Sequence, residues 1–172
     1  MKTPMFCLLL PFGLLSVQAH AGTVTLTSAD VVSALDIEAA IQSATAGGTE
    51  PGIVILDGSA GAFEYTNGDR SINIGVSDLT LRGTNFARIV NCDDGLFFDA
   101  VPVSSILIER IVFDCLGNGI SWTGLGPRER VTVRDNVIQG DMRGITIGDS
   151  LDWRITRNTI IGGSGWLSPP SN

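Results

Sequence analysis

A repeat of 22 to 27 residues runs through the second half of this 172-residue chain. Four ten-residue segments each have apolar residues at the first and third positions and mostly polar residues at the second and fourth. They are Leu79–Arg88, Ile106–Cys115, Val131–Gly140 and Trp153–Gly162. This alternation is typical of a half-buried β-strand. A repeat of this length that holds several short strands and no helix predicts a solenoid of stacked coils.

Each segment is followed by a turn and a second short apolar run that glycine opens. These runs are Gly95–Phe98, Gly119–Trp122, Gly144–Ile147 and Gly165–Leu167. Stacking would align the third position of each segment into an internal apolar column of Leu81, Ile108, Val133 and Ile155. The eighth position is always large and apolar, and its residues are Phe86, Phe113, Ile138 and Ile160. The first segment matches less well after its fourth residue, which predicts a longer turn there.

One helix is expected, near residues 36–46. Apolar residues recur there at i, i+3, i+4 and i+7, a helical spacing, and two glycines follow at 47 and 48. Thr27 and Asp30 stand before this segment at the spacing of a capping box. A strand is expected at Thr23–Leu26. Residues 22–49 therefore form an N-terminal strand and helix, and residues 50–172 form the coils, with further coils expected beyond the C-terminal end.

The first 21 residues have the features of a cleaved signal peptide. Lys2 precedes a nearly continuous apolar stretch, Met5–Val17, and Ala19-His20-Ala21 offers small residues on both sides of His20, as at a signal-peptidase site. The alternative is a retained N-terminal anchor. Cleavage would give a secreted protein (periplasmic, extracellular or on the cell surface) with no membrane span.

Composition after cleavage excludes several kinds of chemistry. Residues 22–172 contain no histidine, no lysine, 10 arginines and 18 acidic residues, a net charge of −8. A catalytic Ser-His-Asp or Cys-His system and an ordinary zinc site need histidine, so both are excluded. The negative charge argues against nucleic acid or an anionic membrane as a partner.

The order of these motifs resembles a known family. A helix, two glycines, the run Gly52–Leu56, then LTLRG and repeated V-T-V-R-x-N and G-I-x-I motifs are similar to the start of a right-handed parallel β-helix in the pectin-lyase-like superfamily, with few coils. The resemblance implies an all-β solenoid whose N-terminal helix plugs the open end. It also implies a short asparagine ladder at Asn136 and Asn158, with Ile111 in that slot one coil earlier. The superfamily contains lyases, hydrolases, epimerases, adhesins and phage spikes, so the fold does not give the activity.

Outward-facing charges are expected to stack with alternating sign. Arg82, Glu109 and Arg134 share one position of the repeat, and the next position holds Arg110, Asp135 and Arg157. Cross-strand pairs of opposite charge contribute about 0.2–1 kcal/mol each. These arginines are therefore interpreted as structural.

The resemblance implies that a catalytic cleft would lie near the strands that glycine opens. Arg143 and Asp94 are the candidate catalytic residues there, and Asp93, Asp94 and Asp141 are candidate calcium ligands. Acidic, glycine-rich turns are also simply well solvated. The Gly-His-Gly and Arg-x-Lys motifs of polygalacturonases are missing, which favours the structural interpretation.

Two functions follow. The favoured hypothesis is a non-catalytic solenoid that binds carbohydrate or a cell-surface partner, because solenoids present long rigid surfaces. The alternative is a polysaccharide lyase or glycosidase that cleaves an acidic polysaccharide by calcium-assisted β-elimination, in a chain that is a fragment of a longer protein. Ca²⁺ is the only cofactor that either hypothesis suggests. The C-terminal edge of the solenoid would need further coils or a partner.

The two cysteines beyond the signal segment permit one disulfide. Cys92 lies three residues before Gly95, and Cys115 lies four before Gly119. The pair is therefore predicted to share a turn in adjacent coils, with Cα atoms within about 4.4–6.8 Å. The offset of one residue leaves the bond itself open.

Overall fold

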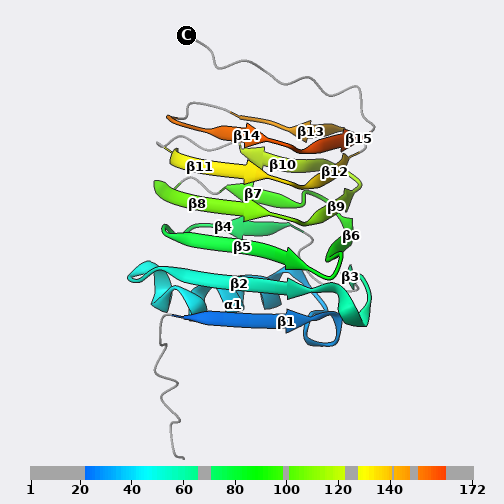
Figure 1. Ribbon diagram of the computed structural model, residues 1–172, viewed down its shortest axis with the longest axis horizontal. Helices are drawn as coiled ribbons and strands as arrows, with labels where there is room; N and C mark the ends of the chain where they lie inside the picture. The colour runs from blue at the N-terminus through cyan, green and yellow to red at the C-terminus, as the bar shows by residue number, and fades with distance from the viewer. Residues whose placement is uncertain are drawn as a thin grey trace, which may run out of the picture.

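The computed structural model describes residues 22–65, 71–98, 101–122, 128–140, 142–147 and 151–161. These residues form a parallel β-solenoid of about four turns with three parallel sheets and one N-terminal helix (Figure 1). The predicted architecture is thus confirmed. Within these ranges no α-helix follows residue 44, as the repeat predicts. The strand run opened by Gly165 lies outside the described residues.

The three sheets stack equivalent strands of successive turns. Sheet A consists, in spatial order, of β1 (Thr23–Thr27), β2 (Gly52–Asp57), β5 (Leu79–Thr84), β8 (Val103–Glu109), β11 (Arg128–Arg134) and β14 (Arg154–Thr156). Sheet B consists of β3 (Phe63–Glu64), β6 (Arg88–Cys92), β9 (Val112–Cys115), β12 (Val137–Gly140) and β15 (Thr159–Ile161). Sheet C consists of β4 (Ile72–Ile74), β7 (Leu96–Phe98), β10 (Asn118–Trp122) and β13 (Arg143–Ile145).

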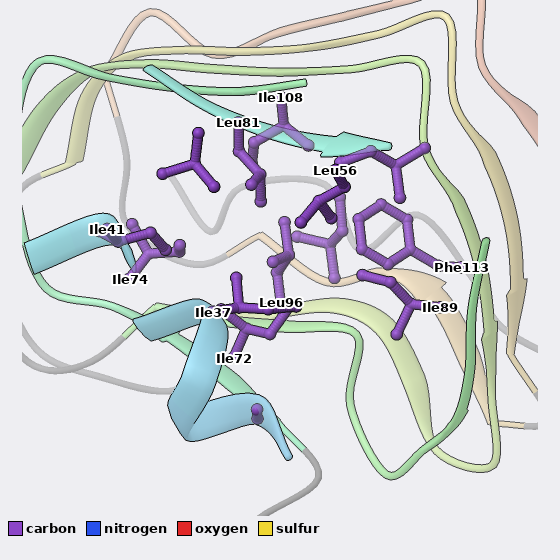
Figure 2. Packing of buried hydrophobic residues seen from close by; sticks show 14 of the residues in the cluster. Ile37, Ile41, Leu56, Ile72, Ile74, Leu81, Ile89, Leu96, Ile108 and Phe113 are labelled. Carbon is purple, nitrogen blue, oxygen red and sulfur yellow. The ribbon is translucent and has the colours of Figure 1, made fainter. Parts of the chain in front are cut away.

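Apolar columns fill the space between the sheets. Leu81 pairs in register with Ile108, Ile108 with Val133, and Val133 with Ile155, as predicted. The first three are fully or almost fully buried. In Figure 2 the side chains of the helix and of all three sheets gather in one continuous core.

Helix α1 (Ala34–Ala44) closes the N-terminal end of this core. It begins two residues before the predicted start, and its buried residues include Ile37, Ala40 and Ile41. Ser33 and Asp36 cap it: the Asp36 carboxylate accepts hydrogen bonds from the backbone N–H groups of Ser33 and Val32, both at 2.9 Å. The pair expected to precede the helix, Thr27 and Asp30, instead caps a short 3-10 helix, η1 (Ser28–Asp30).

The helix is also tied to sheet C. α1 packs against β1, β2 and β4. Glu38 accepts hydrogen bonds from the backbone N–H and the side-chain amide of Asn73, at 2.7 and 2.8 Å. Two more 3-10 turns, η2 (Ala46–Gly48) and η3 (Gly58–Ala60), follow the helix and β2. Gly47 and Gly48 have φ of 69° and 87° just after the helix, where glycine has no steric penalty.

Phe86 does not align with the other residues at the eighth position of the repeat. Phe86 is 95% exposed, and Ile89 occupies the place beside Phe113 in sheet B. Ile89 follows Arg82 by seven positions, whereas Phe113 follows Glu109 by only four. The longer turn that the sequence indicates is real, and its three additional residues move Phe86 out of the core.

The turns above this one are tight and left-handed. Arg110, Asp135 and Arg157 have φ of 60°, 58° and 55°, so each coil bends from sheet A into sheet B at a left-handed residue. The residue after each bend points inward. There Asn136 is buried, its Oδ1 accepts from the Ile111 N–H at 3.0 Å, and its Nδ2 donates to the Ile108 carbonyl at 3.1 Å.

Asn158 repeats this arrangement one coil later. Its Oδ1 accepts from the Asn136 N–H and from Asn136 Nδ2, at 3.0 and 3.1 Å, and its Nδ2 donates to the Val133 carbonyl at 2.8 Å. The predicted two-residue asparagine ladder is therefore present. It satisfies backbone groups at a bend where the sheet ladders are interrupted.

The predicted charge column on sheet A is present as well. Glu109 is almost fully buried between two arginines, with Arg82 Nε at 2.5 Å from Oε1 and Arg134 Nη2 at 2.6 Å from Oε2. Burial by itself raises the pKa of Glu109, but the hydrogen bonds from Arg134 and Arg82 outweigh it and hold the pKa below its ordinary value.

Glu109→Gln should lower the free energy of unfolding at pH 7 by about 1.5–3 kcal/mol, the range for hydrogen bonds to charged groups. Because the folded-state pKa is depressed, this contribution is fully present above the unfolded pKa of about 4.3 and is lost as pH falls through the folded value. Urea unfolding between pH 7 and pH 3 should show a steeper loss of stability for the native chain than for Glu109→Gln. Parallel pH profiles would contradict this assignment.

The two cysteines are joined. Cys92 and Cys115 are register partners at the ends of β6 and β9, with Cα atoms 4.6 Å apart and sulfurs 2.12 Å apart. A register shift between Val90 and Cys92 absorbs the one-residue offset seen in the sequence. The disulfide links two successive turns where the chain leaves sheet B for sheet C.

Candidate functional site

The predicted acidic site is built around Asp94, and the described contacts of Asp94 join neighbouring coils. Its Oδ1 accepts from the N–H and Nδ2 of Asn118, both at 2.8 Å, and its Oδ2 accepts from Ser121 Oγ at 2.8 Å. Its own N–H donates to Ser71 Oγ at 3.2 Å. Both carboxylate oxygens are thus already hydrogen-bonded within the protein.

The other members of the predicted site lie around it. Asp93 is exposed, and its carbonyl accepts the Gly117 N–H at 2.7 Å. Arg143 is exposed and pairs in register with Asn118, so Asn118 lies between Arg143 and Asp94. Two strand spacings, about 10 Å, separate the backbones of Arg143 and Asp94. Asp141 lies outside the described residues.

The part of the chain that the structure describes contains no group of three or more His, Cys, Asp or Glu side chains arranged to hold a metal ion. Of the predicted residues, the register places Asp94 and Arg143 in one column of strand-opening positions, with Asn118 between them. Asp141 is not among the described residues, so the calcium site of Asp93, Asp94 and Asp141 stays a prediction.

A different feature, the Phe86 groove, lies on the ridge between sheets A and B. We define it by the long turn Gly83–Phe86, the tight turn at Arg110–Val112, and Asp135 and Val137 of the next coil. Its volume is about 420 Å³. The groove exists because one long turn lies below several short ones, which creates a step in the stack.

Phe86 forms the exposed edge of this step in a strained backbone conformation. Asn85 and Phe86 have φ of 50° and 58°, and a left-handed φ is uncommon for a bulky residue. The turn is closed by the Ala87 N–H, which donates to the Thr84 carbonyl at 3.0 Å, and anchored by Asn85 Nδ2, which donates to Asp57 Oδ1 at 2.8 Å. Other bends of the solenoid also have left-handed residues, such as Arg110 and Asp135, but Phe86 is large, apolar and exposed, and this combination motivates a functional hypothesis.

Arg110 supplies a cation to the same groove. Within the described residues the carboxylate of Asp135 is occupied by Arg157, whose Nε and Nη2 lie 2.6 and 2.7 Å from its two oxygens. The hydrogen bond from Arg157 holds the pKa of Asp135 below its ordinary value. Arg110 was expected to stack against Asp135, but it is exposed and forms no ion pair with another described residue. Its donors are therefore available to a ligand.

A second hollow, of about 280 Å³, lies beside Pro102, Ser104 and Glu129. Its described lining has neither an aromatic ring nor an arginine. The Phe86 groove is thus the better candidate, although the repeat aligns Phe86 with the buried Phe113 and Ile138. The signal that could have located it is the poor match of the Leu79–Arg88 segment after its fourth residue.

Comparison with protein-family models, with curated proteins and with solved structures finds no match to this chain. Within the described residues, the only α-helix has 11 residues, and none is long and apolar enough to span a bilayer.

Proposed function

We propose that this protein is a secreted, non-catalytic solenoid of the pectin-lyase-like kind that binds carbohydrate through the Phe86 groove. The observation that carries the proposal is the aromatic ring of Phe86, 95% exposed on a strained, anchored turn at the edge of the groove. A polysaccharide of a cell surface would be a natural partner for such a protein.

The chemistry of the groove suits a sugar. A pyranose ring has an apolar face of C–H groups, and such a face can stack on the exposed ring of Phe86. Hydroxyl groups around the sugar ring need donors and acceptors. Arg110 offers side-chain donors. The Asn85 amide keeps a second hydrogen beside its bond to Asp57, and each Asp135 oxygen keeps a second lone pair beside its bond from Arg157. The apolar floor of the groove includes Val112 and Val137. A concave site of mainly apolar lining with a few polar groups is typical of small-ligand sites.

Rigidity favours binding as well. The groove is built on stacked strands, and the Asn85–Asp57 hydrogen bond and the Thr84–Ala87 turn fix the Phe86 edge in advance. Little conformational entropy is then lost when a ligand binds. The lyase alternative has less support, because both oxygens of Asp94 are engaged with Asn118 and Ser121.

Phe86→Ala should weaken saccharide binding about tenfold to a hundredfold, because burying a phenylalanine side chain contributes about 1.5–3 kcal/mol. A glycan array would first select an oligosaccharide, and isothermal titration calorimetry would then give its affinity for each variant. The melting temperature should change little, because the ring is exposed.

The matched control is Leu116→Ala, which removes an apolar side chain that is 52% exposed in a turn outside the groove. It should leave the affinity unchanged. Equal losses in both variants would contradict a site at Phe86, and so would a native chain that binds no glycan on the array.

A further inference from the structure

The first strand of sheet A, β1, forms an open strand edge at the N-terminal end of the solenoid. In the described part of the chain, β1 lies at the edge of sheet A and pairs only with β2 (Figure 1). The Ile53 N–H donates to the Gly22 carbonyl at 2.9 Å. Alternate residues of a parallel strand bond to the same neighbour, so Val24 and Leu26 face β2 while Thr23, Thr25 and Thr27 present their backbone groups to the other side.

One contact supports this orientation. The Thr27 N–H donates to the carboxylate of Asp30, at 2.7 Å, rather than to β2. No described strand meets the backbone groups of Thr23 and Thr25. Proteins usually protect such an edge with a charge, a proline or a bulge. The Asp30 carboxylate protects the Thr27 end of this edge, whereas the Thr23–Leu26 part of β1 has no charge, proline or bulge.

The strand is also self-complementary. Its sequence, Thr-Val-Thr-Leu-Thr, is symmetric about Thr25 in the alternation of threonine and aliphatic residues. Antiparallel pairing of two copies about Thr25 would set Thr23 opposite Thr27, and Val24 opposite Leu26. Because the Thr27 N–H already donates to Asp30, the bonds between the copies would use the N–H groups of Thr23 and Thr25 and the carbonyls of Thr25 and Thr27. A two-fold interface requires a surface that complements itself in this way. The two Asp30 caps would stay apart, because the two Thr27 residues would be about 14 Å from one another along the strands.

Apolar surface is present at the same end. Val24 and Leu26 are only partly buried against the core. Val32 and Leu35, which follow β1 at the start of α1, are 55% and 54% exposed. We propose that β1 pairs antiparallel with β1 of a second copy of this chain, so that sheet A continues through a symmetric dimer. This inference is independent of the proposed carbohydrate site.

Charge reversal at the symmetry axis provides the test. Thr25 would lie opposite its own copy, so Thr25→Lys and Thr25→Glu should each place like charges opposite one another and make the protein monomeric. An equimolar mixture of the two variants should form a dimer again. Sedimentation velocity on the purified full chain would measure the mass of each sample, and circular dichroism would show that each variant is folded.

Thr132→Lys is the matched control, because Thr132 is on the outer face of the same sheet in β11, with β8 and β14 on either side. It should remain a dimer. A native chain that sediments as a monomer would overturn the proposal. This is also the result expected if residues before Gly22 cover β1. A dimer that persists in Thr25→Lys and Thr25→Glu alone would overturn it too, because another surface would then hold the copies together.

Discussion

Gly83→Ala should lower the free energy of unfolding by more than about 4 kcal/mol, a loss that single substitutions reach only when they force a steric conflict or a buried defect. Gly83 lies in β5 and faces the core. A Cβ atom there would be 2.0 Å from the Arg110 carbonyl oxygen and 3.1 Å from the Ala87 Cβ. The carbonyl belongs to the tight left-handed bend above Gly83, so neither backbone can move without breaking the stack. Urea unfolding followed by circular dichroism would measure the loss.

Gly75→Ala is the control for this substitution. A Cβ at Gly75 would meet only Val101 Cγ2, at 3.5 Å, which is ordinary contact, and the φ of Gly75 is not positive. This variant should keep its stability or gain about 0.4–1 kcal/mol, because alanine restricts the unfolded chain. Equal unfolding midpoints for the two variants would contradict the close contact between Gly83 and the Arg110 carbonyl of the next coil.

Removing the disulfide should cost about 3 kcal/mol. The bond joins residues 23 positions apart and so closes a loop in the unfolded chain, for which the chain-entropy model gives a contribution of this size. A Cys92→Ala, Cys115→Ala double variant should therefore unfold at a lower urea concentration. Both cysteines are buried, and replacing both of them with alanine leaves no buried free thiol.

Dithiothreitol supplies the internal control for the disulfide. It should lower the urea midpoint of the native chain toward that of the double variant and leave the double variant unchanged. If thiol titration shows full reduction while the midpoint stays the same, the bond does not constrain the unfolded chain as described.

The fold could be predicted because each coil repeats the same alternation. The internal column through Leu81, Ile108 and Val133 follows from period-2 spacing alone, and so does the Arg82–Glu109–Arg134 clamp on the outer face. These features depend only on which residues share a position in the repeat. The asparagine ladder required the resemblance to β-helix proteins as well.

Phe86 could not be placed by counting positions, because counting assumes turns of constant length. The three additional residues between Arg82 and Ile89 shift every later residue of that coil relative to the others. The helix start was missed for a similar local reason. The spacing that Thr27 and Asp30 show recurs at Ser33 and Asp36, and only the second pair caps α1.

The surroundings of Asp94 were also beyond the sequence. Its partners Asn118 and Ser121 come from the next coil, and they are 24 and 27 positions away. An exposed acidic turn and a hydrogen-bonded junction between coils have the same local sequence. Only the strand register distinguishes these two structures, and stacking and the bulge before Cys92 set that register.

The most direct test of the carbohydrate proposal is a map of the bound ligand on the protein. Backbone amide chemical shifts of the ¹⁵N-labelled chain would be followed by NMR while an oligosaccharide selected on the array is added. The groove predicts the largest changes at Asn85, Phe86, Arg110 and Val112, and none at Asp94 or Arg143. Changes centred on Asp94 and Arg143, with Phe86 and Arg110 unaffected, would contradict it and would favour the cleft that the lyase hypothesis requires.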